Sequence, residues 1–100
     1  MSDNKATLVI TAMINKANMT ELPSYLEQVQ PIFVKNGAKP IGRYKKVLDI
    51  VGVDNPEIIS MTEFDDAETI TAMVQSEDFT ALADLRSRVF SKLNMIICTS

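Results

Sequence analysis

The sequence predicts an α+β fold in which a four-stranded antiparallel sheet carries helices on one face. Three observations lead to this prediction. Short segments rich in β-branched residues alternate with segments of helical periodicity, their order is β-α-β-β-α-β, and 100 residues is a usual size for one domain. We therefore expect residues 1–100 to form a single domain, with about residues 1–5 disordered or frayed.

The first strand is predicted over residues 6–14, "ATLVITAMI", which is apolar on both alternating faces. A helix is predicted over about residues 20–35, where apolar residues recur at every third or fourth position. Pro31 should kink or break the last turn of this helix. Gly37 should end it in a left-handed conformation.

The second half of the chain repeats the pattern. A long strand is predicted over residues 38–52, and it ends at the turn "GVDNP". A third strand follows over residues 57–64, and Asp65 can cap the helix after it. The residues "QSED" interrupt this helical region, a second helical segment follows them, and "LNMIICTS" (93–100) closes the chain as a fourth strand.

Two βαβ halves with right-handed crossovers give a ferredoxin-like sheet with the spatial strand order 4-1-3-2. The helices cover only one face of such a sheet. The first and fourth strands are nevertheless apolar on both faces, so the other face would expose a large apolar patch in a monomer. The sequence therefore predicts a homodimer that forms through this sheet face.

Composition excludes several classes of function. The net charge is −3 and the pI is about 4.8, whereas nucleic-acid-binding domains are usually basic, so we expect no nucleic-acid partner. The chain has no histidine and one cysteine, Cys98, so we expect no metal site and no cofactor. A lone cysteine and the lack of a signal peptide or an apolar span indicate a cytoplasmic protein, with no membrane partner.

The stretch "AKPIGRYKKV" (38–47) holds four of the ten basic residues of the chain. The predicted strand order places it at a sheet edge, where lysines commonly prevent pairing with other molecules. Arg43 differs from its neighbours, because an arginine can bind a carboxylate in a forked geometry. It either lines a pocket and binds an anionic ligand, or it pairs with Glu63.

Five residues are candidates for a ligand site: Arg43, Glu63, Arg86, Ser76 and Tyr25. Glu63 ends an inner strand, where a carboxylate either pairs with Arg43 or Arg86 or acts as a base with a raised pKa. Arg86 either contacts a ligand or ties its helix to a strand. Tyr25 is either a core residue or a ligand contact, and Ser76 is either a helix cap or a ligand contact.

Several segments together resemble domain-of-unknown-function family 1330, which belongs to the dimeric α/β barrel superfamily. These segments are "KNGAKPIGR" after the first helix, "ISMTEF" in the third strand and "QSEDFTALADLR" in the last helical region. The resemblance extends from about residue 6 to residue 98. Ala38 and Lys39 depart from the glycine and arginine usual in the family. The residues that match its pattern are Gly37, Arg43, Glu63, Phe64, Ser76, Phe79 and Arg86.

The resemblance implies a ferredoxin-like fold and a dimer, and it leaves two functions open. In the first, the chain binds a small anionic or carbonyl compound and belongs with the cofactor-independent enzymes found among dimeric α/β barrels. In the second, it is a non-catalytic dimeric module with a structural or regulatory role. The first predicts a pocket of a few hundred cubic ångströms, and the second predicts that Arg43, Glu63 and Arg86 form a closed triad.

Overall fold

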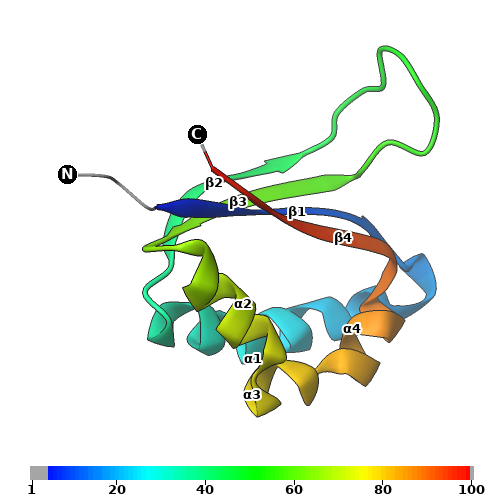
Figure 1. Cartoon of the computed structure of the whole chain (residues 1–100). Coiled ribbons are helices and arrows are strands. Elements are labelled where there is room, and N and C mark those ends of the chain that lie inside the picture. Colours follow the sequence, from blue (N-terminus) through cyan, green and yellow to red (C-terminus); the bar gives the residue numbers. More distant parts are fainter. Residues whose placement is uncertain (1–4, 100) are drawn as a thin grey trace.

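The computed structural model of the protein describes residues 5–99 (Figure 1). The predicted disorder of about residues 1–5 lies outside this range, apart from Lys5. In the described range the elements are β1 (Ala6–Ile14), the 3₁₀ helix η1 (Lys16–Glu21), α1 (Leu22–Lys35), β2 (Lys39–Lys45), β3 (Ile58–Phe64), α2 (Ala67–Gln75), α3 (Glu77–Thr80), α4 (Ala83–Val89) and β4 (Phe90–Cys98).

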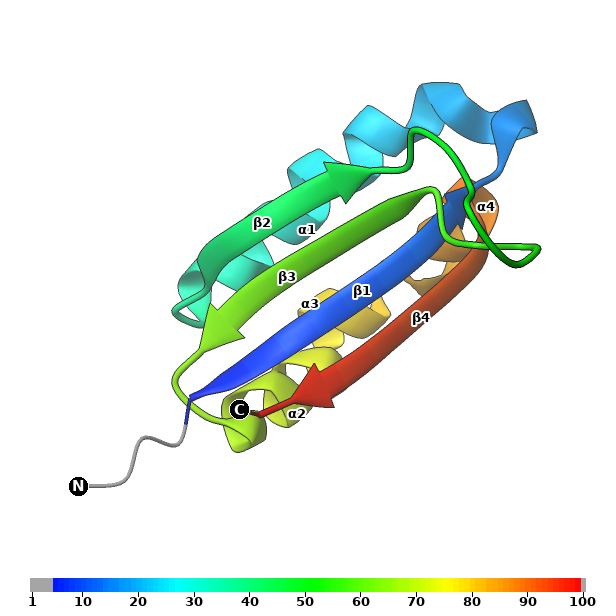
Figure 2. The ribbon, with the colours of Figure 1, turned by 90° about the horizontal axis from the view of Figure 1, so that it is seen from above.

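The sheet has the predicted ferredoxin-like arrangement. Strand β1 pairs antiparallel with β3 and β4, and β2 pairs antiparallel with β3, so the order is β2-β3-β1-β4 with β2 at an edge. Figures 1 and 2 show the helices on one face of the sheet, here called the helix face. No described helix or strand covers the opposite face, here called the outer face. None of the helices among residues 5–99 combines the length and the hydropathy that a membrane-spanning helix needs.

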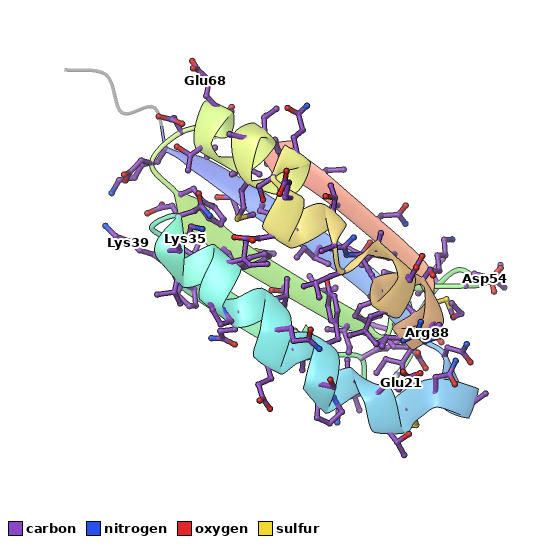
Figure 3. The ribbon with its side chains drawn as sticks, turned by 90° about the horizontal axis from the view of Figure 1, so that it is seen from below. Glu21, Lys35, Lys39, Asp54, Glu68 and Arg88 are labelled. Carbon is purple, nitrogen blue, oxygen red and sulfur yellow. The ribbon has the colours of Figure 1, made fainter. Side chains whose placement is uncertain are left out.

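The hydrophobic core lies between the helices and the helix face. Alternate residues of β1 (Ala6, Leu8 and Ala12) are buried there, as the alternation of side chains along a strand requires. Ion pairs connect the helices at the rim of this layer, and one joins Glu21 to Arg88 at 3.1 Å (Figure 3). The other buried apolar residues are Tyr25, Val29, Ile32, Phe64, Ile70, Met73, Phe79, Leu82 and Val89.

Helix α1 passes through Pro31, so of the predicted kink or break the break does not occur. The helix continues to Lys35 with Pro31 inside it. Proline removes the hydrogen bond to the carbonyl of Glu27, but both residues are exposed, so water can solvate that carbonyl. Burial of Val29 and Ile32 against the sheet keeps the helical path on the other side.

Gly37 ends α1, as predicted. Its φ is +84°, and its N–H donates to the carbonyl of Val34 at 3.0 Å. The N–H of Ala38 donates to the carbonyl of Phe33 at 3.1 Å. These two bonds form the Schellman pattern, in which a left-handed residue closes the helix and reverses the chain. The chain therefore enters β2 directly beneath the end of α1.

The second strand is much shorter than predicted. It ends at Lys45, and residues 46–57 form a loop rather than the end of a strand over 38–52. The loop is rich in β-branched residues, which are common in strands. High β propensity reflects packing on a sheet and not the backbone alone. Residues 46–57 have no neighbouring strand in the described chain, so they do not form one.

The second helical region begins and ends differently from the prediction. Asp66, and not Asp65, caps α2: its side chain accepts hydrogen bonds from the N–H and the hydroxyl of Thr69, each at 2.7 Å. These bonds hold the pKa of Asp66 below its usual value. Ser76 caps α3 by accepting from the N–H of Phe79 at 3.3 Å, so the interruption of the helix at "QSED" is confirmed.

The last strand begins at residue 90, three residues before the predicted start.

Replacing Gly37 by Ala should lower the free energy of unfolding by about 1–2 kcal/mol, because a Cβ makes the left-handed conformation unfavourable. Gly37→Asn should cost less, since asparagine adopts this conformation more readily than alanine. Urea unfolding followed by circular dichroism measures both values. An alanine variant as stable as the wild type would show that the turn does not require a positive φ.

Candidate functional site

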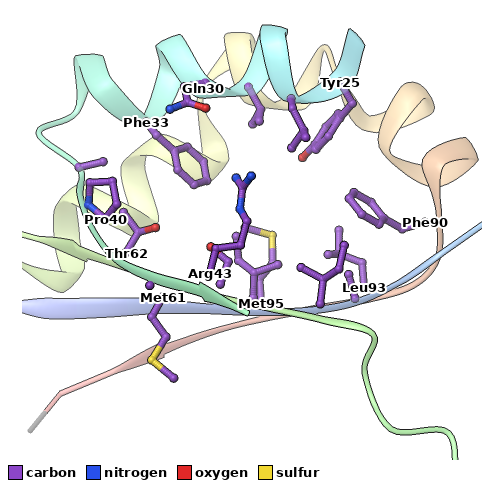
Figure 4. Close-up of a pocket in the computed structure, with 18 of the residues that line it drawn as sticks. Tyr25, Gln30, Phe33, Pro40, Arg43, Met61, Thr62, Phe90, Leu93 and Met95 are labelled. Carbon is purple, nitrogen blue, oxygen red and sulfur yellow. The ribbon is translucent and has the colours of Figure 1, made fainter. Parts of the chain in front are cut away.

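A cavity of about 450 Å³ lies between α1 and the sheet (Figure 4). Side chains of α1 form one wall, and helix-face side chains of the sheet form the other. The volume is in the range of small-molecule sites in proteins. Most of the lining is apolar, and it includes Ile10, Leu26, Phe33, Ile58, Leu93 and Met95.

A β-bulge in β2 turns Arg43 toward this cavity. The pairing between β2 and β3 shifts by one residue at Ile41, which has no partner on β3. Because side chains alternate along a strand, the extra residue moves every later side chain to the opposite face. Arg43 therefore lies opposite Ser60 on the helix face, and Figure 4 shows its side chain pointing into the cavity.

Arg43 supplies the charge of the site. Among the described residues that line the cavity, it alone carries a charge. It makes no hydrogen bond or ion pair with any of residues 5–99. An arginine on the wall of an apolar cavity can bind an anionic group with two parallel N–H donors. The site is thus arranged to receive negative charge.

Two hydroxyl groups of β3 lie on the same wall. Ser60 is directly opposite Arg43, and Thr62 is two residues further along the helix face. Thr62 is buried, with 6% of its surface exposed, and neither hydroxyl group bonds to another described residue. Both can therefore donate a hydrogen bond to a ligand bound at Arg43. Sequence analysis missed these two residues. They alternate with Met61 along an inner strand, and this spacing indicates that both hydroxyl groups lie on the same face of the sheet.

Tyr25 reaches the cavity from α1, and Arg86 fixes its position. The Nε–H of Arg86 donates to the Tyr25 hydroxyl oxygen at 3.0 Å, and the ring of Phe90 meets the Tyr25 ring edge-on at 5.5 Å. Arg86 also donates to the carbonyl of Phe79 at 2.8 Å and stacks on its ring at 3.9 Å. It therefore ties α4 to α1 and α3, rather than to a strand, and it lies outside the cavity.

Glu63 lies on the other side of the sheet. Its partner in β1 is Thr7 on the outer face, and its carboxylate is 3.6 Å from the ammonium of Lys5. The expected pairing with Arg43 or Arg86 is not formed, because the bulge moves Arg43 to the helix face. Of the candidates, Tyr25 and Arg43 line the cavity, whereas Glu63, Arg86 and Ser76 do not.

Other groups near the site add little charge. Gln30, an uncharged residue that the sequence analysis did not single out, lines the cavity from α1. In the described part of the chain, no three cysteine or carboxylate side chains gather closely enough to hold a metal ion. The role of each candidate residue in ligand binding stays a prediction.

Replacing Arg86 by Met should lower the free energy of unfolding by about 1–3 kcal/mol, because two hydrogen bonds and a stacking contact are lost. Arg88→Met is the control on the same helix: its pair with Glu21 is exposed, and its loss should matter less. Thermal unfolding compares the two. Equal effects of the two substitutions would show that Arg86 is not a tether.

Comparison with solved structures supports the fold. A protein of unknown function from Rhodopseudomonas palustris has a TM-score of 0.81 at 11% identity, over 99% of this chain and 84% of that one. A dimeric protein of unknown function and ferredoxin-like fold from Bacteroides fragilis has a TM-score of 0.67 at 9% identity, over 97% of both chains. SnoaB, a cofactor-independent oxygenase from Streptomyces nogalater, has a TM-score of 0.70 at 9% identity, over 97% of this chain and 93% of that one.

At these identities the comparisons establish the fold alone, which is ferredoxin-like. No curated protein sequence matches the chain. A family model does match it over residues 6–100, nearly the whole length, and the resemblance seen in the sequence is confirmed. The chain belongs to the family described as domain of unknown function DUF1330.

Proposed function

We propose that the chain binds a small anionic or carbonyl compound in the cavity between α1 and the sheet. The observation that carries this proposal is an apolar cavity of about 450 Å³ with one unpaired cation, Arg43, on its wall. The alternative, a non-catalytic module, predicts a closed triad of Arg43, Glu63 and Arg86 without free space. That triad is absent among the described residues, which favours ligand binding.

The cavity also contains groups that could assist a reaction. Arg43 can stabilise negative charge that develops on a bound carbonyl compound. The Tyr25 oxygen accepts a hydrogen bond from Arg86, so its own O–H is free to donate to a ligand. SnoaB has the same fold and is a cofactor-independent oxygenase, which is an analogy at the level of the fold. The proposal therefore extends to a cofactor-independent enzyme.

Filling the cavity should weaken ligand binding. Leu26→Trp adds volume on the α1 wall, whereas Gln28→Trp adds the same ring on the exposed side of that helix. The neutral fluorescent probe N-phenyl-1-naphthylamine should bind the wild type and Gln28→Trp, and should bind Leu26→Trp at least about tenfold more weakly. Equal binding to all three proteins would contradict the proposed site. Native mass spectrometry of the purified chain would identify a co-purifying compound.

We propose further that the protein forms a homodimer through the outer face. One row across the sheet on this face contains Met61, Val9 and Ile96, and 55% of the Ile96 surface is exposed. The ring of Tyr44 extends the apolar surface over Gly42 at the β2 edge. A neighbour with the same fold is dimeric. We propose a cytoplasmic location without a nucleic-acid partner on the composition alone.

Ile96→Lys should raise the dimer dissociation constant by about a hundredfold or more, because association would bury an unpaired charge. Thr71→Lys adds the same charge on the exposed side of α2 and should leave association unchanged. Sedimentation equilibrium measures both constants. If Ile96→Lys associates as tightly as the wild type, the outer face is not the interface.

A further inference from the structure

We propose that the cavity takes a ligand that is already ionised when it binds, namely an aromatic carboxylic acid with a single anionic group. This inference rests on the proposed binding function and narrows it. An anionic ligand and a neutral carbonyl compound make different demands on the protein. The described residues that line the cavity include a cation and hydroxyl donors for an anionic ligand, but no carboxylate or lysine that could act as a general base on a neutral carbonyl compound.

The charge of the cavity fits a monoanion. Arg43 is the one charged side chain among the described lining residues, so a second anionic group on the ligand would have no cationic partner. The Ser60 and Thr62 hydroxyls lie on the same wall as Arg43 and have no other described partner. A planar carboxylate can accept two N–H bonds from the guanidinium and further bonds from hydroxyl groups. Its charge and its hydrogen-bonding capacity are then both satisfied.

The cavity has no general base for a neutral carbonyl compound. No aspartate, glutamate or lysine is among its described lining residues, and the chain contains no histidine. Tyr25 is the one phenol among the described lining residues, and its oxygen already accepts a bond from Arg86 at 3.0 Å. Activation by proton abstraction needs an acceptor within hydrogen-bond reach. A ligand that is ionised in water at neutral pH needs none.

The shape and lining of the cavity favour an aromatic body. Arg43 extends from edge strand β2, so the anionic head lies on the β2 side of the cavity and the body of the ligand extends away from it along the apolar lining. Figure 4 shows Phe33, Tyr25 and Phe90 arranged around the cavity. Their rings offer edges and faces for the offset and edge-on contacts that aromatic groups prefer.

Two probes of the same size and shape test this inference: 2-naphthoic acid, which is ionised at neutral pH, and its neutral amide, 2-naphthamide. Isothermal titration calorimetry should show that the acid binds the wild type about ten- to a hundredfold more tightly than the amide. Arg43→Met should abolish this preference. Lys39→Met should retain it, because it removes the same charge from the same strand on the outer face.

The outcomes separate this inference from the proposed function. Equal binding of acid and amide, or a preference that survives Arg43→Met, would overturn selection of an ionised ligand and leave the cavity as a small-molecule site. Failure of both probes to bind would overturn the aromatic acid. If N-phenyl-1-naphthylamine also failed to bind the wild type, the proposed function would fall as well.

A second and independent observation concerns residues 46–57, here called the arm. Five large apolar side chains of the arm are exposed to solvent, and Val47, Ile50 and Val53 are 98%, 91% and 86% exposed. The other two are Leu48 and Val51. Exposed apolar groups gathered in one segment usually mark a contact surface. We infer that the arm packs against a second copy of this chain, in the dimer proposed above.

Hydrogen bonds within the arm hold these apolar side chains outward. Asn55 donates to the Asp49 carboxylate at 3.0 Å and to the Val51 carbonyl at 3.1 Å, and Lys46 reaches Asp49 at 3.2 Å. The bonds from Asn55 and Lys46 keep the pKa of Asp49 below its usual value. At the base of the arm, the N–H of Lys46 donates to the Glu57 carbonyl at 2.8 Å. The arm is therefore formed before any partner binds.

The direction of the arm identifies its partner. Figure 1 shows that it rises on the side of the sheet away from the helices, which is the side of the proposed dimer interface. Its base borders the outer face at a small hollow lined by Met13, Asp54 and Lys92. Two sheets that pack face to face lie about 10 Å apart, so an arm that rises above one sheet meets the edge of the other. In a two-fold dimer each arm makes this contact.

Replacing the five apolar residues of the arm by serine should raise the dimer dissociation constant at least about tenfold, as loss of apolar burial requires. The control, Met19→Ser with Val34→Ser, removes exposed apolar groups on the helix side and should leave association unchanged. Sedimentation equilibrium measures all three proteins. If the dimer dissociation constant of the arm variant were unchanged, the proposed arm contact would be overturned and the proposed dimer would stand. A monomeric wild type would overturn both the arm contact and the dimer.

Discussion

The central strand β1 carries apolar side chains on both of its faces, and the organisation of the molecule depends on this property. Leu8 and its neighbours of the same parity are buried beneath the helices. Val9 and Met13, of the other parity, lie on a face that no described helix or strand covers. All the described helices lie on the side of Leu8, so the sheet is covered on one face only (Figure 1). The helix face therefore holds the core and the cavity, and the outer face is available to a partner.

The bulge at Ile41 separates two groups of charged residues that a regular strand would place together. A strand without it would put Arg43 on the outer face, on the same side as Glu63. With it, Arg43 enters an apolar cavity without a carboxylate partner, and Glu63 stays with Lys5 on the other side. In an unbroken ladder Arg43 would lie on the same face as Glu63, which could neutralise its charge. The extra residue, Ile41, instead leaves Arg43 available for a ligand.

Contacts between helices set the other wall of the cavity. Arg86 engages both Tyr25 and Phe79, so the three segments α1, α3 and α4 are held at a fixed spacing above the sheet. Because Tyr25 is fixed from outside the cavity, its ring and hydroxyl are pre-positioned for a ligand. Arg86, which resembles a site residue in the sequence, acts in the structure through Tyr25.

Periodicity and turn residues act locally, so the order of the elements and the end of α1 at Gly37 could be predicted from the sequence, and the strand order and the family followed from them. The sequence also showed that β1 and β4 are apolar on both faces. The face that Arg43 occupies depends on how β2 pairs with β3, since a one-residue shift in pairing leaves no mark in the periodicity of "KPIGRYK". The same holds for residues 46–57, whose β-branched composition suits a strand or an exposed arm equally well. The presence of a neighbouring strand decides between the two, and that neighbour is absent from the described chain.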